Sequence, residues 1–217
     1  MIFDIGMHRG VDTKRYLSMG YRVVAVEANP VLAQQCATEL SDHIASGRLT
    51  IENVGIYKNP GSLPFYRNLA CDEWSSFVPH LGQRLGQFDT ITVDCITVHD
   101  LLARHGIPFF MKVDVEGIDE IVAADVGKCA IRPRYISIED GGFQSLLALQ
   151  NAGVRHFKFV NQPKAQETFG RSSSGPFGEE IEGPWLTAHE AFAFYCANVR
   201  PPNSEPIDGW WDIHGEY

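Results

Sequence analysis

The chain has few features of an exported or membrane-bound protein. No apolar stretch approaches the roughly 20 residues that a membrane span needs, and no secretory signal precedes the first predicted strand. The five cysteines are odd in number and scattered, without a C-x-x-C pair, which argues against a disulfide framework and against a zinc site. We therefore expect a cytoplasmic protein with reduced thiols.

Basic charge is also scarce. The 217 residues carry a formal net charge of −9 and contain no long basic run. Neither nucleic acid nor an anionic membrane is therefore an expected partner. A chain of this length can form one α/β domain with a full core. The sequence leaves the oligomeric state open.

The glycine pattern of dinucleotide-binding proteins is absent. That pattern, G-x-G-x-x-G, would need glycines at the positions of His8 and Val11. The N-terminus instead reads Asp4-x-Gly6-x-x-x-Gly10, with a carboxylate two residues before the first glycine. Because a carboxylate there repels a pyrophosphate, the spacing argues against NAD. It favours a nucleoside cofactor with a cationic end, such as the ammonium group of S-adenosylmethionine.

A second strand, predicted over 23–26, ends in an acidic residue, Glu27. This residue lies about twenty positions beyond the glycine turn, where a carboxylate accepts hydrogen bonds from ribose hydroxyls. Asn53, near the end of the next predicted strand, is expected beside the adenine. The predicted cofactor-binding residues are Asp4, Gly6, His8, Gly10, Glu27 and Asn53.

Strands and helices alternate as far as residue 161. We predict strands over 49–56, 90–96, 109–115, 135–139 and 156–160. A turn at 59–62 is expected to open a hairpin, and a helix that follows Pro30 is expected to bury Leu32, Cys36, Leu40 and Ile44. The alternation implies an α/β fold, Rossmann-like, with a mostly parallel sheet and helices on both faces. Ligands in such sheets bind beyond the carboxyl ends of the strands.

The segment K-V-D-V-E-G, which begins at Lys112, is a second candidate site. Strand alternation puts Lys112, Asp114 and Glu116 on one side. A lysine between carboxylates is a candidate for proton transfer, because neighbouring charges shift each pKa. An ion pair that ties a strand end to a helix N-terminus, where Glu116 suits the helix dipole, explains the same pattern. The spacing leaves both interpretations open.

The character of the chain changes after residue 161. A Ser/Gly-rich loop at 171–178 precedes aromatic residues set among glycines and prolines. We divide the chain into a cofactor-binding core, 1–161, and a C-terminal extension, 162–217, packed on the same domain. The aromatic residues either fill the gap between the extension and the sheet or form a lid over a substrate. We favour the lid, with Trp185 and His214 against the substrate.

Four motifs occur in order along the chain: D-I-G-x-x-x-G from Asp4, V-A-V-E-A-N-P from Val24, F-M-K-V-D-V-E-G from Phe110 and I-S-I-E from Ile136. Together they resemble the FkbM family of S-adenosylmethionine-dependent methyltransferases. The resemblance implies a Rossmann-like class I methyltransferase fold. It also implies methyl transfer, typically to a hydroxyl of a sugar or a secondary metabolite. The chain departs from the family at His8, where asparagine is usual.

Methyl transfer to a hydroxyl needs a group that takes up the hydroxyl proton. Asp114 is the expected general base, Lys112 tunes it, and Glu116 or Glu139 orients a small-molecule or carbohydrate acceptor. A metal-assisted variant, ranked second, would use Asp114, Glu116, Glu139 and Asp140 as ligands for Mg²⁺. A non-catalytic nucleoside-binding module is the competing class of protein. It would have no need of Lys112, Asp114 and Glu116, so their presence favours an enzyme.

Overall fold

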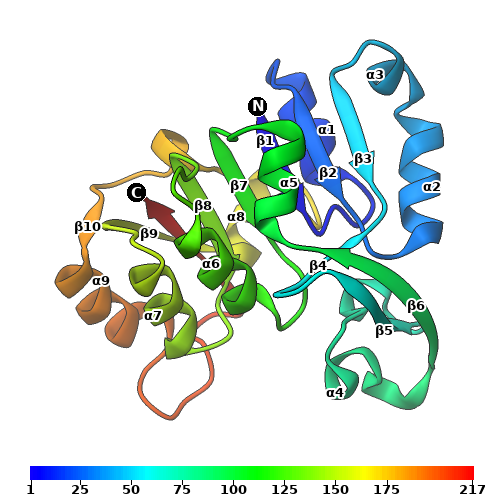
Figure 1. The fold of residues 1–217 in the computed structure, drawn as a ribbon. Helices are drawn as coiled ribbons and strands as arrows, with labels where there is room; N and C mark the ends of the chain where they lie inside the picture. The colour runs from blue at the N-terminus through cyan, green and yellow to red at the C-terminus, as the bar shows by residue number, and fades with distance from the viewer.

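A computed structural model describes all residues from 1 to 217, and its main feature is an eight-stranded sheet (Figure 1). The strands of this sheet are β1 (Ile2–Ile5), β2 (Val23–Val26), β3 (Leu49–Glu52), β7 (Phe110–Val113), β8 (Tyr135–Glu139), β9 (His156–Asn161), β10 (Leu186–Thr187) and β11 (Trp211–Glu216). Their order is β10-β9-β11-β8-β7-β1-β2-β3. The five strands from β3 to β8 are parallel, whereas β11 runs antiparallel to both of its neighbours. The predicted α/β class and mostly parallel sheet are confirmed.

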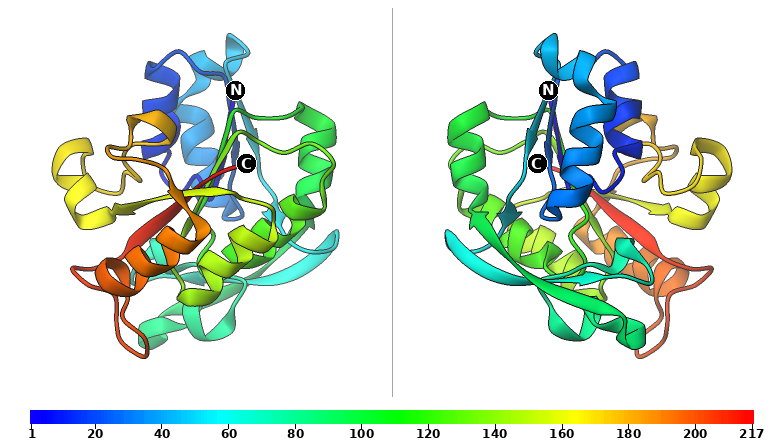
Figure 2. Two further views of the ribbon diagram at one scale, coloured as in Figure 1. Left: turned by 90° about the vertical axis from the view of Figure 1, so that its left-hand side faces the viewer. Right: turned by 90° about the vertical axis from the view of Figure 1, so that its right-hand side faces the viewer.

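Helices cover both faces of the sheet, as Figure 2 shows. They are α1 (Val11–Ser18), α2 (Pro30–Glu39), α3 (Ser41–Ala45), α4 (Pro79–Gly82), α5 (Val98–His105), α6 (Asp119–Lys128), α7 (Phe143–Asn151), α8 (Gln162–Phe169) and α9 (Ala188–Phe194). One apolar cluster packs α5, α6, α7 and α9 against the sheet, and a second packs α1 and α2 on the opposite face. None of these helices combines the length and the apolar character that crossing a membrane requires.

The alternation of side chains in β1 determines where its one charged residue lies. Phe3 and Ile5 belong to the larger apolar cluster, whereas Ile2 belongs to the cluster beneath α1 and α2. Asp4 shares the face of Ile2, because alternate residues of a strand point the same way. Lys112 of β7 is in register with Asp4. Both charged side chains are buried, so the fold places a carboxylate and an ammonium group together beneath α1.

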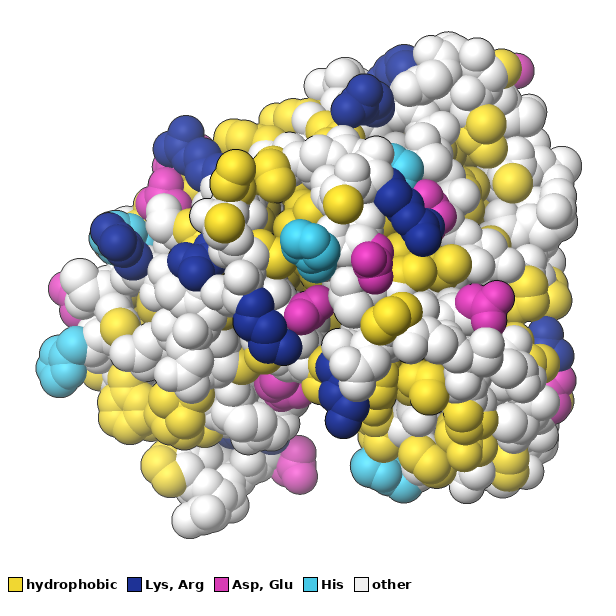
Figure 3. All heavy atoms as spheres, in the orientation of Figure 1, with side chains coloured by type: hydrophobic (Ala, Val, Ile, Leu, Met, Phe, Trp, Pro, Cys, Tyr) yellow, Lys and Arg dark blue, Asp and Glu magenta, His cyan; other side chains and the backbone are white.

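A second, smaller sheet forms a separate lobe. Its order is β4-β6-β5, with β4 (Gly55–Ile56), β5 (Gly61–Asn68) and β6 (Phe88–Ile96). The predicted hairpin is wrong, because β5 pairs with β6, which comes much later in the chain. The single strand predicted over 49–56 is also wrong. Asn53 donates from Nδ2 to the backbone oxygen of Glu27 at 2.7 Å and separates β3 from β4. Figure 3 shows a notch between this lobe and the main body.

The helix predicted after Pro30 is broken. Leu40 has φ −105° and ψ 22°, and α2 ends there before α3 begins. Leu32, Cys36 and Leu40 are buried as predicted, but Ile44 is 38% exposed. After α3 the chain turns back toward β3. The backbone nitrogen of Arg48 donates a hydrogen bond to the backbone oxygen of His43 at 2.9 Å and closes this turn. The turn leaves Ile44 at the edge of the sheet.

The C-terminal extension contributes strands to the main sheet, which the sequence analysis did not predict. β11 lies between β8 and β9, and its residues 212–216 pair with β8 while residues 211–216 pair with β9. Trp211 and Ile213 face the larger apolar cluster. Asp212 and His214 therefore face the other way, and both are buried. The boundary drawn at residue 161 falls between β9 and α8, and the extension is part of the same sheet.

The burial of His214 affects stability as pH changes. It is 2% exposed, neither ring nitrogen has a hydrogen-bond partner, and burial together with the Lys158 charge lowers its pKa from 6.5 to about 3. Since the unfolded chain alone binds a proton in this window, His214 removes stability as pH falls from 6.5 toward 3.

His214→Leu should therefore gain stability relative to the wild type in mild acid. The difference in unfolding free energy should shift in favour of the variant by about 2 kcal/mol between about pH 7.5 and pH 5. Urea denaturation of both proteins at the two pH values measures it. A difference that stays constant with pH would contradict the assignment.

Candidate active site

A cavity of about 1030 Å³ opens at the carboxyl ends of β1, β2, β7 and β8. The order of strands reverses between β1 and β7, and open α/β sheets bind their ligands at such a point. One wall comes from the small lobe and includes the 3₁₀ turn η1 (Asp72–Trp74). Another wall comes from residues 171–174 and Trp210 of the extension. The cavity therefore lies where a cofactor and a second substrate can meet.

The glycine turn after β1 brings three strand ends together. Gly6 has φ +88°, and a Cβ on it would lie 1.7 Å from the backbone oxygen of Asp114, so no side chain fits. Gly10 has φ +71° and is the N-cap of α1. Between them, His8 has φ +50° and donates from its backbone nitrogen to Glu27 Oε2 at 2.7 Å. The turn thus contacts both the segment after β7 and the end of β2.

Glu27 is held at the floor of the cavity. It is 7% exposed, and its Oε1 accepts a hydrogen bond from the backbone nitrogen of Asn29 at 2.7 Å. Burial raises the pKa of the Glu27 carboxyl, and the bonds from Asn29 and His8 partly oppose this rise. Each carboxylate oxygen retains a further acceptor site. Glu27 can therefore accept hydrogen bonds from two hydroxyls in the cavity.

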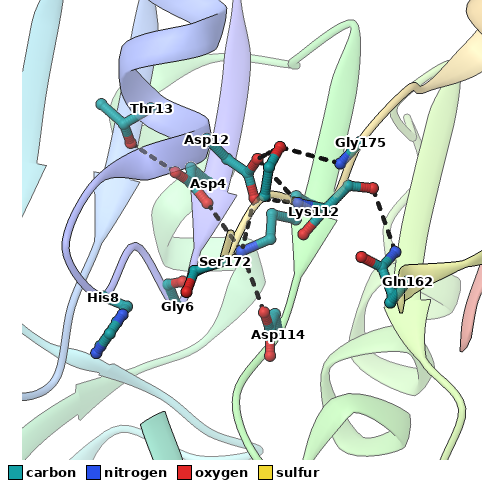
Figure 4. A network of polar contacts seen from close by, with 12 residues as sticks. Asp4, Gly6, His8, Asp12, Thr13, Lys112, Asp114, Gln162, Ser172 and Gly175 are labelled. Atoms are coloured by element: carbon teal, nitrogen blue, oxygen red, sulfur yellow. Dashed lines mark hydrogen bonds and ion pairs between the residues drawn. The ribbon is translucent and has the colours of Figure 1, made fainter. Parts of the chain in front are cut away.

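Lys112 is the centre of a buried ion network (Figure 4). Its Nζ lies 3.3 Å from Asp114 Oδ2 and 3.5 Å from both Asp4 Oδ1 and Asp12 Oδ2, and it donates to the backbone oxygen of Gly6 at 3.3 Å. Burial lowers the pKa of Lys112, but the three carboxylates outweigh this and leave it well above its usual value. Lys112 is therefore a fixed cation that orients the carboxylates around it.

Asp4 lies beneath the cavity and does not line it. Its Oδ2 accepts a hydrogen bond from Thr13 Oγ1 at 2.5 Å, and Oδ1 faces Lys112. Burial raises the pKa of Asp4 to about 6, although the Lys112 charge opposes the shift. Its influence on a cofactor would therefore be electrostatic, transmitted through Lys112, and not a direct contact.

A group of carboxylates lies at the opposite end of the cavity from Glu27. Asp114, Glu116 and Glu139 have carboxylate oxygens within 4.8 Å of one another. Burial, then repulsion from Asp114, raises the pKa of Glu116 to about 8 and that of Glu139 to about 10. The same causes raise the pKa of Asp212 well above its usual range. Asp212 is in register with Glu139 on β11. This end of the cavity favours a cation or a neutral hydroxyl over an anion.

Seven of the twelve predicted site residues line the cavity. They are Gly6, His8, Glu27, Lys112, Asp114, Glu116 and Glu139. The five that do not are Asp4, Gly10, Asn53, Trp185 and His214. Trp185 stacks on Tyr135 with ring centroids 5.5 Å apart, and its Nε1 donates to Glu179. His214 is enclosed between β8 and β9. The residues by which the extension reaches the cavity are instead Gln162, Gln166, Trp210, Asp212 and the loop at 171–174.

Several residues that close the cavity were not predicted. His8 Nε2 lies 2.9 Å from Asp72 Oδ1 in η1, and Ser172 Oγ donates to Glu73 at 2.8 Å. Asp12 accepts hydrogen bonds from Ser173 and Ser174 of the same loop. Residues 67–88 show no periodicity in the sequence, so no signal pointed to η1. Asp212 could have been found from the alternation of residues 211–214 in a strand.

The sheet, the glycine turn and the acidic end of β2 define a Rossmann-like fold with a candidate nucleoside-binding site. The family model described as "Methyltransferase FkbM domain" matches residues 4–162. The chain belongs to the FkbM methyltransferase family, and the predicted resemblance is confirmed.

Two solved structures match this chain at low sequence identity. A methyltransferase FkbM from Methylobacillus flagellatus KT is 17% identical with a TM-score of 0.47, over 69% of this chain and 35% of that one. A precorrin-6y C5,15-methyltransferase from Geobacter metallireducens GS-15 is 13% identical with a TM-score of 0.40, over 99% of this chain and 77% of that one. This chain thus spans about a third of the length of the first. A search of curated proteins found no match.

The ion network makes a prediction about stability. Lys112→Met leaves Asp4 and Asp12 buried without their cation, and losing one partner of a buried ion pair costs about 3–5 kcal/mol. Urea unfolding should show a loss of this size. Adding Asp4→Asn to the variant should recover part of it, because one buried charge is then removed. No recovery in the double variant would contradict the role given to the pair.

Proposed function

We propose that the protein transfers a methyl group from S-adenosylmethionine to a hydroxyl oxygen of a sugar or another small hydroxylated metabolite. The observation that carries the proposal is one cavity that joins the free acceptor sites of Glu27 to the Lys112–Asp114 ion pair. Membership of a methyltransferase family supports the use of S-adenosylmethionine in general. The carboxylates that line the cavity support a hydroxyl acceptor.

The proposed cofactor site uses the end of the cavity nearest β1 and β2. Glu27 would accept hydrogen bonds from the two ribose hydroxyls, and Gly6 would let the cofactor approach the backbone. Asp4, Asp12 and Asp114 together carry more negative charge than Lys112 neutralises. The resulting negative potential favours the sulfonium and ammonium groups of S-adenosylmethionine over a pyrophosphate.

The proposed reaction is an in-line displacement. The acceptor oxygen forms a bond to the methyl carbon while the carbon–sulfur bond breaks, and the sulfonium becomes a neutral thioether. The hydroxyl proton must leave, and Asp114 is the proposed acceptor for it. Its side chain is 44% exposed, and Lys112 holds Oδ2, so Oδ1 can accept the proton. Glu116 and Glu139, which line the same end, would orient the acceptor.

Binding experiments test the cofactor assignment. Calorimetry should show that the protein binds S-adenosylmethionine and S-adenosylhomocysteine but not NAD. Glu27→Ala should weaken binding by about 1–3 kcal/mol, because ribose hydroxyls lose their acceptor. Glu39→Gln, on the exposed end of α2, is the matched control and should bind normally. NAD binding without a response to either adenosyl compound would refute the assignment.

Turnover experiments test the proposed base. Asp114→Asn keeps the shape of the side chain but removes the proton acceptor, so turnover should fall by about 10²–10⁴-fold with nearly unchanged cofactor affinity. Formation of S-adenosylhomocysteine would be followed with nucleotide sugars, oligosaccharides and hydroxylated metabolites. Asp94→Asn on exposed β6 is the control. Parallel losses of affinity and turnover would instead identify Asp114 as a cofactor ligand.

A further inference from the structure

We propose that Asp114, Glu116 and Glu139 bind a divalent cation of the Mg²⁺ class at the acceptor end of the cavity; its catalytic purpose rests on the methyl transfer proposed above. The three carboxylate oxygens lie within 4.8 Å of one another. Ligands on opposite sides of a hard cation are about 4–5 Å apart, because each metal–oxygen distance is about 2.0–2.6 Å. The spacing therefore allows all three to reach one ion.

The sheet holds these ligands in place before any ion binds. β7, β8 and β11 are neighbours, and Asp114 directly follows β7 while Glu139 is the last residue of β8. Glu116 lies in the turn after β7, and its backbone oxygen accepts a hydrogen bond from Ser76 Oγ at 2.6 Å. Since the strands fix the backbone on both sides, little ordering is needed on binding.

Asp212 provides a second, independent observation. It is 8% exposed and lines the same cavity, and no hydrogen bond or ion pair satisfies its carboxylate. A buried carboxylate without a partner is costly. Its register with Glu139 places it beside the three ligands on the same face. Mg²⁺ usually keeps several waters, and one of them would give Asp212 the hydrogen bond that it lacks.

The protein's own cations do not neutralise this group. Lys112 contacts Asp114, and Arg84 lies 3.9 Å from Glu116, but neither comes within ion-pair distance of Glu139 or Asp212. Lys112 is shared with two further carboxylates beneath the cavity. Two acidic side chains at this end of the cavity, Glu139 and Asp212, therefore have no cationic partner within the protein, which leaves room for a divalent cation beside them.

Asp140, which the sequence analysis placed among the ligands of the metal-assisted variant, is not one of them. Its Oδ1 accepts a hydrogen bond from Tyr195 at 2.7 Å, and its Oδ2 contacts Arg200 Nε at 3.0 Å. Its Oδ1 also accepts a hydrogen bond from the backbone nitrogen of Gly142 at 3.1 Å, so these partners already satisfy the carboxylate, and Asp140 is not among the carboxylates that lie within 4.8 Å of one another. Asp212 takes its place beside Glu139, although the two are far apart in the sequence. A cation here would lower the pKa of a coordinated acceptor hydroxyl, and the hydroxyl proton would pass to the Asp114 carboxylate oxygen that does not hold the ion.

Mn²⁺ is the probe for this site, because its paramagnetism reports binding without any turnover. The full chain, treated with EDTA and free of S-adenosylmethionine, should bind one Mn²⁺, and Mg²⁺ should displace it. Glu139→Gln and Asp212→Asn should each weaken Mn²⁺ binding at least about tenfold. Glu205→Gln, an exposed carboxylate away from the cavity, is the control and should bind Mn²⁺ normally. Glu116→Gln, in a turn, replaces either variant that fails to fold.

The outcomes separate this site from the proposed function. Absence of Mn²⁺ binding, or binding that Glu139→Gln does not weaken, would overturn the metal site. Methyl transfer at full rate in EDTA would overturn the catalytic purpose given to the ion while upholding the proposed function. Mn²⁺ binding that depends on Glu139 and Asp212 supports the site even if no acceptor is methylated. A failure to methylate any acceptor would count only against the proposed methyl transfer.

Discussion

The ammonium group of Lys112 joins three parts of the chain that are far apart in sequence. Asp4 comes from β1, Asp12 from α1 and Asp114 from the segment after β7, and all three lie within 3.5 Å of the same nitrogen. Asp12 also accepts hydrogen bonds from the loop at 171–174. In a buried environment these attractions are strong, and each unpaired charge would be costly. The cofactor turn, the proposed base and one cavity wall therefore depend on one cation.

The parallel half of the sheet could be predicted because its sequence signals are local. β1, β2, β7 and β8 are short apolar runs bounded by glycine, proline or acidic residues, and helices with clear periodicity separate them. The small sheet could not, since β5 pairs with β6 across a long insertion that has no periodicity. β11 was missed because Asp212 and His214 are polar residues that are buried, so the strand resembles a surface segment.

The residues of the candidate site also differ in whether a local sequence signal could predict them. Residues at strand ends, such as Glu27, Asp114 and Glu139, were predicted because parallel strands present their carboxyl ends at one edge. Residues whose position depends on packing between distant segments were not: Asp72 approaches His8 only through the small lobe. Trp185 is the opposite case, a residue that was predicted to contact the substrate but lies outside the cavity. The composition of the segment around it is typical of a lid, whereas its ring packs on Tyr135. Proximity in space, which composition does not encode, decides these cases.

The insertion of β11 between β8 and β9 has a consequence for biosynthesis. β8 and β9 leave the ribosome well before the strand that separates them, so their edges stay unpaired until residues 211–216 arrive. β8 and β9 must not pair directly with each other during folding, because such pairing would exclude β11 from its place between them. Asp212 enters the acceptor end of the cavity with β11. The nascent chain would therefore complete its acidic pocket only after residues 211–216 have been synthesised and β11 has entered the sheet.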